Sequence, residues 1–279
     1  MEKHFDVIKT SGERARFSVE KLRRSLERSG ADKKSIDQII DVVRDELYQG
    51  ISTREIYNRA FAMLRESKPI VASKYKLKKA IYELGPTGFP FERFISAMLA
   101  YSGFDTIVGQ VMQGKCVAHE IDVVARKDGR HIMAECKFHG DEGIKCNVKI
   151  PLYIRSRYSD IIDYFEGMND IATKPNEGWV VTNTRFTKDA LDYGSCSGLY
   201  LLSWDYPEGN SLRERIDRLG LYPVTVSTLL SQREKQFLLS RDVVLCRELI
   251  NDTFYLDHLE ISPKRKSRIL KEINQLCTT

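Results

Sequence analysis

Two apolar runs near the middle of the chain constrain its fold more than any other feature, because a turn-forming segment joins them. The runs cover residues 116–126 and 131–138, and Lys127-Asp128-Gly129-Arg130 lies between them. Such runs, separated by Asp and Gly, predict neighbouring antiparallel strands. A further strand-like run at 106–112 follows a helical pattern at 91–101. This part of the chain therefore predicts a β-meander behind a helix.

Charged residues interrupt the apolar pattern of the first run. Successive residues of a strand face opposite sides of the sheet. We therefore expect Glu120 and Asp122 on one face, and Ile121 and Val123 on the other. Carboxylates on a core strand are costly unless they are paired or bind a metal.

The second run ends in a similar way, because the same alternation places Glu135 and Lys137 together. Across the short turn, these residues can converge with Asp122. Two carboxylates and a lysine suit phosphodiester hydrolysis, in which the carboxylates hold Mg²⁺ and the lysine offsets charge or orients water. An ordinary cross-strand ion pair is the alternative explanation.

Periodicity and turn residues divide the chain into three predicted domains, at residues 1–84, 85–206 and 207–279. The first consists of a β-hairpin (5–9 and 15–18) and four helices that run to the linker at 85–90. The second has strands and helices in an order that predicts a mixed sheet flanked by helices. The third is helical, with capping boxes at Ser211 and Ser231. We therefore expect a multidomain α+β and α/β protein.

Length and composition agree with this division. The 279 residues are 42% hydrophobic and 30% charged, which predicts two or three packed domains. The chain has no apolar run long enough to span a membrane, and its start lacks the apolar stretch of a signal peptide. We expect a cytoplasmic protein without a membrane partner, and its six cysteines to be reduced and mostly buried.

Charge is distributed unevenly along the chain. Residues 1–84 carry 19 Lys and Arg against 13 Asp and Glu, whereas residues 85–206 carry 13 against 16. The net charge of the whole chain is +5. An acidic middle domain that handles a polyanion needs basic neighbours or bound cations.

The middle domain resembles the PD-(D/E)xK nucleases, and in particular the Mrr-type restriction endonucleases. The motifs are His119-Glu120-Ile121-Asp122 and Glu135-Cys136-Lys137, supported by the helix that begins near Gly88 and by the stretch 178–190. The resemblance covers roughly residues 86–205 and implies a restriction-endonuclease-like mixed sheet. It also implies that Asp122 and Glu135 are metal ligands, that Lys137 is the catalytic lysine and that Glu92 is an accessory ligand. The proline of the motif is missing before Asp122, and the role of Lys149, where many members have a glutamine, stays open.

Zinc binding by Cys116 and His119, or by Cys136 and His139, is a competing interpretation. Residues three apart on a strand face opposite sides, which disfavours chelation by either pair.

The N-terminal domain resembles the ATP-cone, a nucleotide-binding regulatory module. The resemblance covers about residues 3–84, and it implies that Lys9 and Lys21 contact the phosphates. A lysine-arginine pair that is common in the family's hairpin is replaced here by Lys9-Thr10, with Arg14 or Arg16 as substitutes. A basic helical domain that contacts DNA is the alternative.

Together these observations predict a restriction-type DNA endonuclease that depends on Mg²⁺ or Mn²⁺ and is regulated by ATP or dATP without hydrolysing it. A double-strand cut calls for two active sites, so we expect a homodimer or a larger even-numbered oligomer. The alternative is a non-catalytic, nucleotide-responsive DNA-binding regulator built on a nuclease scaffold. Basic residues in 207–279 could meet phosphates or form a solvated helix face.

Overall fold

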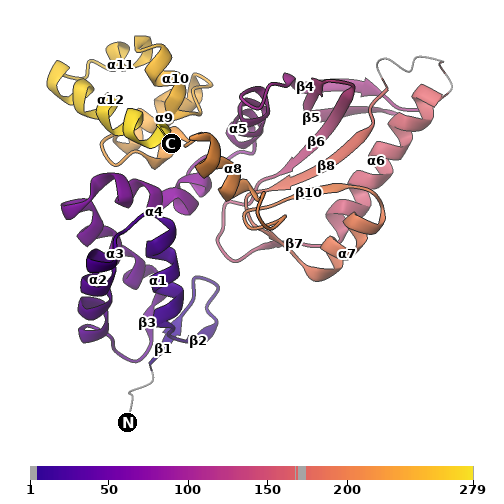
Figure 1. Cartoon of the computed structure of the whole chain (residues 1–279). Coiled ribbons are helices and arrows are strands. Elements are labelled where there is room, and N and C mark those ends of the chain that lie inside the picture. The colour runs from indigo at the N-terminus through magenta and orange to yellow at the C-terminus, as the bar shows by residue number, and fades with distance from the viewer. Residues whose placement is uncertain (1–4, 167, 169–173, 279) are drawn as a thin grey trace.

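The computed structural model describes residues 5–166, 168 and 174–278, and Figure 1 shows how their elements are grouped. A small hairpin and helices α1 to α4 form the N-terminal group, a five-stranded sheet with covering helices forms the middle, and further helices end the chain. This arrangement agrees with the predicted mixed α/β protein of several domains. Among the described residues, no helix is long and apolar enough to cross a membrane.

The N-terminal group contains the predicted hairpin and helices. The hydroxyls of Ser18 and Ser52 accept hydrogen bonds from the N–H groups of Lys21 and Glu55, at 3.3 and 3.0 Å, and so cap α1 and α3. Strand β3 is not predicted, because two residues that pair in parallel with β1 leave no periodicity in the sequence. The elements are β1 (Asp6–Ile8), β2 (Arg14–Arg16), α1 (Val19–Arg28), α2 (Lys33–Asp45), β3 (Ile51–Ser52), α3 (Thr53–Ser67) and α4 (Pro69–Tyr82).

The sheet of the middle group is mixed, as the order of strands and helices predicts. Its strand order is β10-β8-β6-β5-β4, in which β4, β5 and β6 are antiparallel while β8 and β10 run parallel to β6. Helix α5 packs on one face, and α6 and α7 pack on the other (Figure 1). The elements are α5 (Phe89–Ala100), β4 (Asp105–Gln113), β5 (Ala118–Lys127), β6 (Arg130–Lys137), β7 (Lys145–Cys146), α6 (Lys149–Glu166), β8 (Glu177–Thr182), β9 (Arg185–Phe186), α7 (Lys188–Cys196) and β10 (Tyr200–Leu202).

The alternation predicted for β5 breaks at Asp122. Ile121 packs with Ile161 of α6, whereas Val123 packs in the core that contains α5, so the prediction that Ile121 and Val123 share a face is wrong. On the neighbouring strand, Gly109 has a φ of +68°, and the register of β4 with β5 skips the Gly109–Asp122 pair. Glycine adopts this left-handed conformation without a steric penalty, and such a distortion interrupts the alternation of side chains.

The C-terminal group is helical, and both predicted capping boxes are confirmed, at Ser211 with Glu214 and at Ser231 with Glu234. Its helices pack together with α4 and α5 in one hydrophobic core. The elements are α8 (Leu212–Leu219), a 3-10 turn (Val224–Val226), α9 (Gln232–Ser240), α10 (Cys246–Asn251), α11 (Phe254–His258) and α12 (Pro263–Cys277).

Helix α4 belongs to two hydrophobic cores. Ala72 and Tyr75, in its first half, pack with the N-terminal group, whereas Leu77 and Ile81 pack with α5 and the C-terminal helices. The Leu84 side chain is buried in the core of Leu77 and Ile81 as well, so the packing continues past the end of α4 toward α5. Helix α4 therefore connects the N-terminal group to the rest of the molecule (Figure 1).

Candidate functional site

The pairing of strands β5 and β6 ends next to two acidic residues, Asp122 on β5 and Glu135 on β6. Their pairing ends at Val123 opposite Ala134, and beyond that point the N–H of Cys136 donates to the Asp122 carboxylate at 2.7 Å. Asp122 therefore lies between the two strands. Burial raises the pKa of Asp122, while the Cys136 N–H and the charge of Arg157 act in the opposite direction.

Glu135, on β6, forms an ion pair with Arg157 of α6, and the carboxylate oxygen and guanidinium nitrogen are 2.6 Å apart. The Glu135 side chain is 22% exposed and that of Arg157 is 13% exposed. Arg157 also donates to the backbone oxygen of Glu120. Burial and the nearby charge of Asp122 raise the pKa of Glu135 to about 7 in spite of Arg157.

Glu92, in the first turn of α5, is the third member of this acidic cluster. Burial and the charges of Asp122 and Glu120 raise the pKa of Glu92 to about 7. The absence of a side chain at Gly88 leaves room for it, since a Cβ there would lie 3.3 Å from the Glu92 carboxylate. We call Glu92, Asp122 and Glu135 the acidic cluster, because these three carboxylates, from three different elements, interact electrostatically.

Lys137 is the last residue of β6 and its side chain is exposed. Its charge lowers the pKa of Asp122, although less than other groups do. Its backbone oxygen accepts a hydrogen bond from the hydroxyl of Thr182 on β8 at 2.8 Å, which fixes the end of the strand. The structure therefore places this lysine at the edge of the acidic cluster.

The acidic cluster matches the ligand chemistry of Mg²⁺ without forming a closed cage. Among the described residues, no three or more His, Cys, Asp or Glu side chains are grouped to hold a metal ion. Mg²⁺ prefers oxygen ligands and is usually bound by one or two carboxylates together with water and substrate phosphate. Asp122 and Glu135 offer such oxygens, and their mutual repulsion favours a cation. In the structure, Arg157 is the cation beside them.

Arg157 is the main residue of the site that sequence reasoning missed. Helix α6 is continuous from Lys149 to Glu166, and on it Lys149, Tyr153 and Arg157 follow one another at a spacing of four. The Arg157 guanidinium lies 5.4 Å from the centre of the Tyr153 ring. A prediction of helix for the whole of this stretch would have placed Tyr153 and Arg157 on one face. It also places Lys149 one turn before Tyr153, on the same side of the helix.

The competing zinc site does not form among the described residues. Cys136 is buried, whereas Cys116 is exposed in the turn between β4 and β5, and all six cysteines are free. His119 instead pairs with Asp160 of α6 at 2.7 Å, and this interaction lowers the pKa of Asp160 to about 2. Asp160 also accepts the N–H of Cys116 at 2.8 Å, so it attaches the turn to α6.

Lys9 and Lys21, the two predicted phosphate contacts, line one cavity of about 220 Å³ in the N-terminal group. Lys9 comes from the hairpin and Lys21 from α1, and Arg16 lines the same cavity. Lys9 also forms an exposed ion pair with Glu13 at 2.9 Å. Three cationic side chains thus line the cavity.

Two tyrosines that the sequence analysis did not single out line the same cavity. The rings of Tyr57 and Tyr75 are parallel within 9°, with centres 5.1 Å apart. Burial raises the pKa of Tyr75 to about 12, and the hydroxyl of Tyr57 is buried without a hydrogen-bond partner among the described residues. Aromatic rings beside cationic groups suit a ligand with a flat base and an anionic tail.

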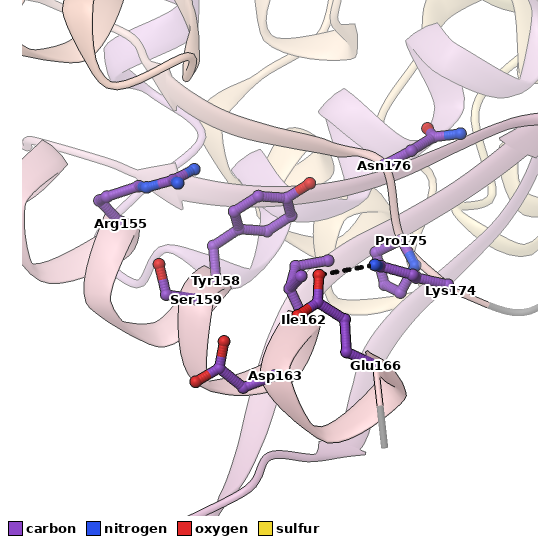
Figure 2. Close-up of a pocket in the computed structure, with 9 residues that line it drawn as sticks. All are labelled: Arg155, Tyr158, Ser159, Ile162, Asp163, Glu166, Lys174, Pro175 and Asn176. Atoms are coloured by element: carbon purple, nitrogen blue, oxygen red, sulfur yellow. Dashed lines mark hydrogen bonds and ion pairs between the residues drawn. The ribbon is translucent and has the colours of Figure 1, made fainter. Parts of the chain in front are cut away.

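A separate cavity of about 560 Å³ lies along α6 (Figure 2). Glu166 and Lys174 form an ion pair of 3.0 Å at one end of the cavity. Figure 2 shows Arg155 toward the other end, with Asp163 on the same helix. The acidic cluster does not contribute to its lining. Because acidic and basic side chains are balanced there, the cavity shows no preference for an anion or a cation.

Two family models match the chain. The "ATP cone domain" model matches residues 5–83, and the "AF1548-like, C-terminal" model matches residues 222–277. The predicted ATP cone is therefore confirmed, and this match supports the binding of an adenine nucleotide by the N-terminal group. The resemblance to Mrr-type nucleases has no such support from the family models.

The chain is also similar to proteins without a known activity. An uncharacterized protein of Archaeoglobus fulgidus is 31% identical over 183 residues, which are 65% of this chain and 99% of that protein. A crystal structure described as "Protein of Unknown Function AF1548" is 28% identical, with a TM-score of 0.56, over 68% of this chain and 98% of that one. This chain therefore belongs to the AF1548-like family and carries, in addition, an ATP cone domain at residues 5–83.

Proposed function

We propose that the chain is a Mg²⁺-dependent DNA endonuclease regulated by an adenine nucleotide, and that its middle domain has a restriction-endonuclease-like fold. The observation that carries this proposal is the acidic cluster. Glu92, Asp122 and Glu135 come from a helix and two strands and interact electrostatically near the point where β5 and β6 separate, with Lys137 at the end of β6. Such a group of mutually repelling carboxylates is expected where a site must attract cations.

Asp122 and Glu135 would hold the metal, and Glu92 would be an accessory ligand. A bound Mg²⁺ would polarise the phosphate and lower the pKa of a water molecule. Arg157 orients Glu135 and offsets its charge. Lys137, at the edge of the cluster, would orient the attacking water or stabilise negative charge on the phosphate.

Nucleotide regulation would act through α4. Tyr75 of α4 lines the cavity of Lys9 and Lys21. On the same helix, Ser73 donates to Glu272 at 2.9 Å and the Lys76 ammonium donates to the Thr225 oxygen at 2.9 Å. Because one helix contacts both the cavity and the C-terminal group, a nucleotide that favours one position of α4 would affect the rest of the molecule.

One observation favours a second candidate, a non-catalytic DNA-binding regulator that responds to nucleotide. Arg157 already neutralises Glu135, and ion-pair networks of this kind also occur in proteins without an active site. The two candidates differ in a single respect, since the regulator would bind DNA and never cut it.

The experiment that tests the proposal incubates supercoiled plasmid with the full chain and Mg²⁺ or Mn²⁺, with and without ATP. We expect nicking or linearisation that requires metal and is lost in Glu135→Gln, while folding and DNA binding are retained. Glu166→Gln is the matched control, because Glu166 is an exposed acidic residue of α6 outside the acidic cluster. Metal-dependent cleavage by Glu135→Gln at the wild-type rate, or no cleavage by any preparation that binds DNA, would contradict the nuclease proposal.

A further inference from the structure

The turn of the N-terminal hairpin contacts a loop of the middle group. The hairpin of β1 and β2 projects toward the middle group (Figure 1), and the hydroxyl of Thr10, in its turn, donates to the Glu142 carboxylate at 3.3 Å. Next to this hydrogen bond, a Cβ at Gly143 would lie 3.4 Å from the Cβ of Ser11. Two segments whose bonded residues are 132 positions apart in the chain therefore meet at this point.

The loop that Thr10 contacts leads away from the acidic cluster. It begins after Lys137, the last residue of β6, and it ends at β7, shortly before α6. Its start is fixed, because the N–H of His139 donates to the Asn183 side chain at 2.8 Å and the Asn183 amide donates back to the His139 oxygen at 2.8 Å. Residues 140–145 that follow are all exposed. The hydrogen bond from Thr10 therefore holds the exposed middle of a segment that starts beside the proposed catalytic lysine.

The same hairpin turn carries Lys9, one of the cationic residues that line the N-terminal cavity. Lys9 directly precedes Thr10, and its ammonium lies 2.9 Å from the Glu13 carboxylate on the other side of the turn. This pairing lowers the pKa of Glu13, and the charge of Lys145, at the end of the loop, adds a smaller effect in the same direction. A phosphate that binds Lys9 competes with Glu13 for it, and so disturbs the turn that contacts the loop.

Glu142 also lies close enough to the N-terminal cavity to interact with it electrostatically. Burial raises the pKa of Tyr57, which lines the cavity, and the charge of Glu142 is one of those that raise it further. Burial and the charge of Glu142 likewise raise the pKa of Tyr82, on α4, to about 12. A triphosphate in this cavity would bring several negative charges near the Glu142 carboxylate. Because like charges repel, nucleotide binding and the contact of Thr10 with Glu142 oppose each other.

We propose that the hairpin turn and the loop at 140–145 form a switch, in which a bound adenine nucleotide breaks the contact between Thr10 and Glu142. The phosphates take Lys9 from Glu13 and repel Glu142. The loop is therefore held by the hairpin in the free protein and released in the nucleotide-bound protein, beside the end of β6. This inference rests on the nucleotide regulation in the proposed function, and it adds a route from the cavity toward the acidic cluster that does not pass through α4.

The test measures the affinity of the full chain for ATP by calorimetry, without DNA. If ATP must break the contact, a variant without the contact binds ATP more tightly, because the coupling is reciprocal. We expect Glu142→Gln to tighten ATP binding about fivefold, the lower end of typical coupling between sites. Thr10→Val removes only the hydrogen bond and should tighten binding less. Glu166→Gln, which removes an exposed carboxylate at the far end of α6, is the control and should bind like wild type.

A disulfide between positions 11 and 143 would hold the contact closed, since the two Cβ positions are close to the separation of about 3.5–4.5 Å that a disulfide needs. Ser11→Cys is combined with Gly143→Cys in a protein that carries Cys116→Ser and Cys196→Ser, because these two cysteines are exposed. Gly143 has a φ of +95°, which costs stability for other residues, so the reduced form of the same protein is the reference. We expect the oxidised form to bind ATP at least about fivefold more weakly than the reduced form.

Equal ATP affinity in the wild type, in Glu142→Gln and in both redox forms of the crosslinked protein would overturn this inference and leave the nucleotide site standing. Weaker ATP binding by Glu142→Gln would overturn it as well, since the carboxylate would then favour the nucleotide. So would the absence of a disulfide between positions 11 and 143 under oxidising conditions, because the hairpin and the loop would then not meet. No ATP binding by the wild type would contradict the proposed nucleotide regulation together with this inference. Failure of DNA cleavage would leave the result standing, since the measurements contain no DNA.

Discussion

Replacing Arg157 with Met tests whether the acidic cluster is a site for a cation. The guanidinium lies 2.6 Å from the Glu135 carboxylate, and both side chains are mostly buried. Removing it leaves Glu135 facing Asp122 and Glu92 without its partner, and Met keeps the apolar part of the side chain. Breaking a fully buried pair costs about 3–5 kcal/mol, but the partial exposure of this pair reduces the expected loss to about 2 kcal/mol.

Mg²⁺ should restore most of this stability. A ligand present at a hundred times its Kd stabilises the folded state by about 2.7 kcal/mol, which is similar to the loss expected for Arg157→Met. The wild type should gain less from Mg²⁺, because Arg157 competes with the metal for Glu135. In Arg157→Met, Mg²⁺ binding can therefore be measured as an increase in the free energy of unfolding, without any measurement of cleavage.

Urea denaturation measures both effects through the fluorescence of Trp179 and Trp204, which are buried in and next to the sheet. Arg155→Met is the matched control, since Arg155 lies on the same helix, contacts the Tyr158 ring at 5.5 Å and lines the cavity of Figure 2. We expect the control to lose under about 1 kcal/mol and to show no added response to Mg²⁺. An Arg157→Met protein that is as stable as wild type and insensitive to Mg²⁺ would refute the reasoning.

Four further predictions concern the other parts of the molecule. Lys9→Ala combined with Lys21→Ala should weaken ATP or dATP binding in calorimetry and make cleavage insensitive to ATP, whereas equal affinity would exclude the cavity as the site. Glu272→Ala should lower the free energy of unfolding by about 3 kcal/mol, because Glu272 is 4% exposed and accepts four hydrogen bonds from Ser73, Ser227 and Thr228. A loss below about 1 kcal/mol in urea denaturation would contradict this. Burial and the neighbouring Lys76 lower the pKa of Lys235, so the unfolded chain binds the extra proton and stability should rise from neutral pH toward pH ~10. Lys235→Met should remove that rise, and an unchanged pH profile would count against it. Light scattering should show a dimer or a larger even-numbered assembly, and a strict monomer that linearises plasmid in one event would contradict the need for two sites.

Interactions between residues close in the chain made much of the fold predictable. The helix starts at Ser18, Ser52, Ser211 and Ser231 depend on a side chain and an N–H three positions later, so the sequence contains both partners. The hairpin of β5 and β6 likewise follows from one short turn. The positions of Asp122 and Glu135 could be predicted because both are within a few residues of that turn.

Contacts between distant residues decided the details of the acidic cluster. The alternation of side chains on β5 breaks at Asp122, where the pairing of β4 with β5 skips Gly109 and Asp122. This break depends on both strands together, so the sequence of either strand alone does not predict it. Arg157 reaches Glu135 only because α6 packs across the sheet, 22 positions later in the chain. Such a contact depends on how elements pack, which periodicity within one element does not describe.

The connection between the parts was likewise set by tertiary packing. The sequence places a boundary at the Gly- and Pro-rich segment 85–90, since such residues are common in linkers. In the structure, apolar residues before and after this segment are buried in one core, and Lys76 and Ser73 bond to residues about 150 to 200 positions away. The composition of a segment indicates only whether it resembles a linker. The burial of α4 against the C-terminal helices depends instead on complementary surfaces of elements that are distant in the chain.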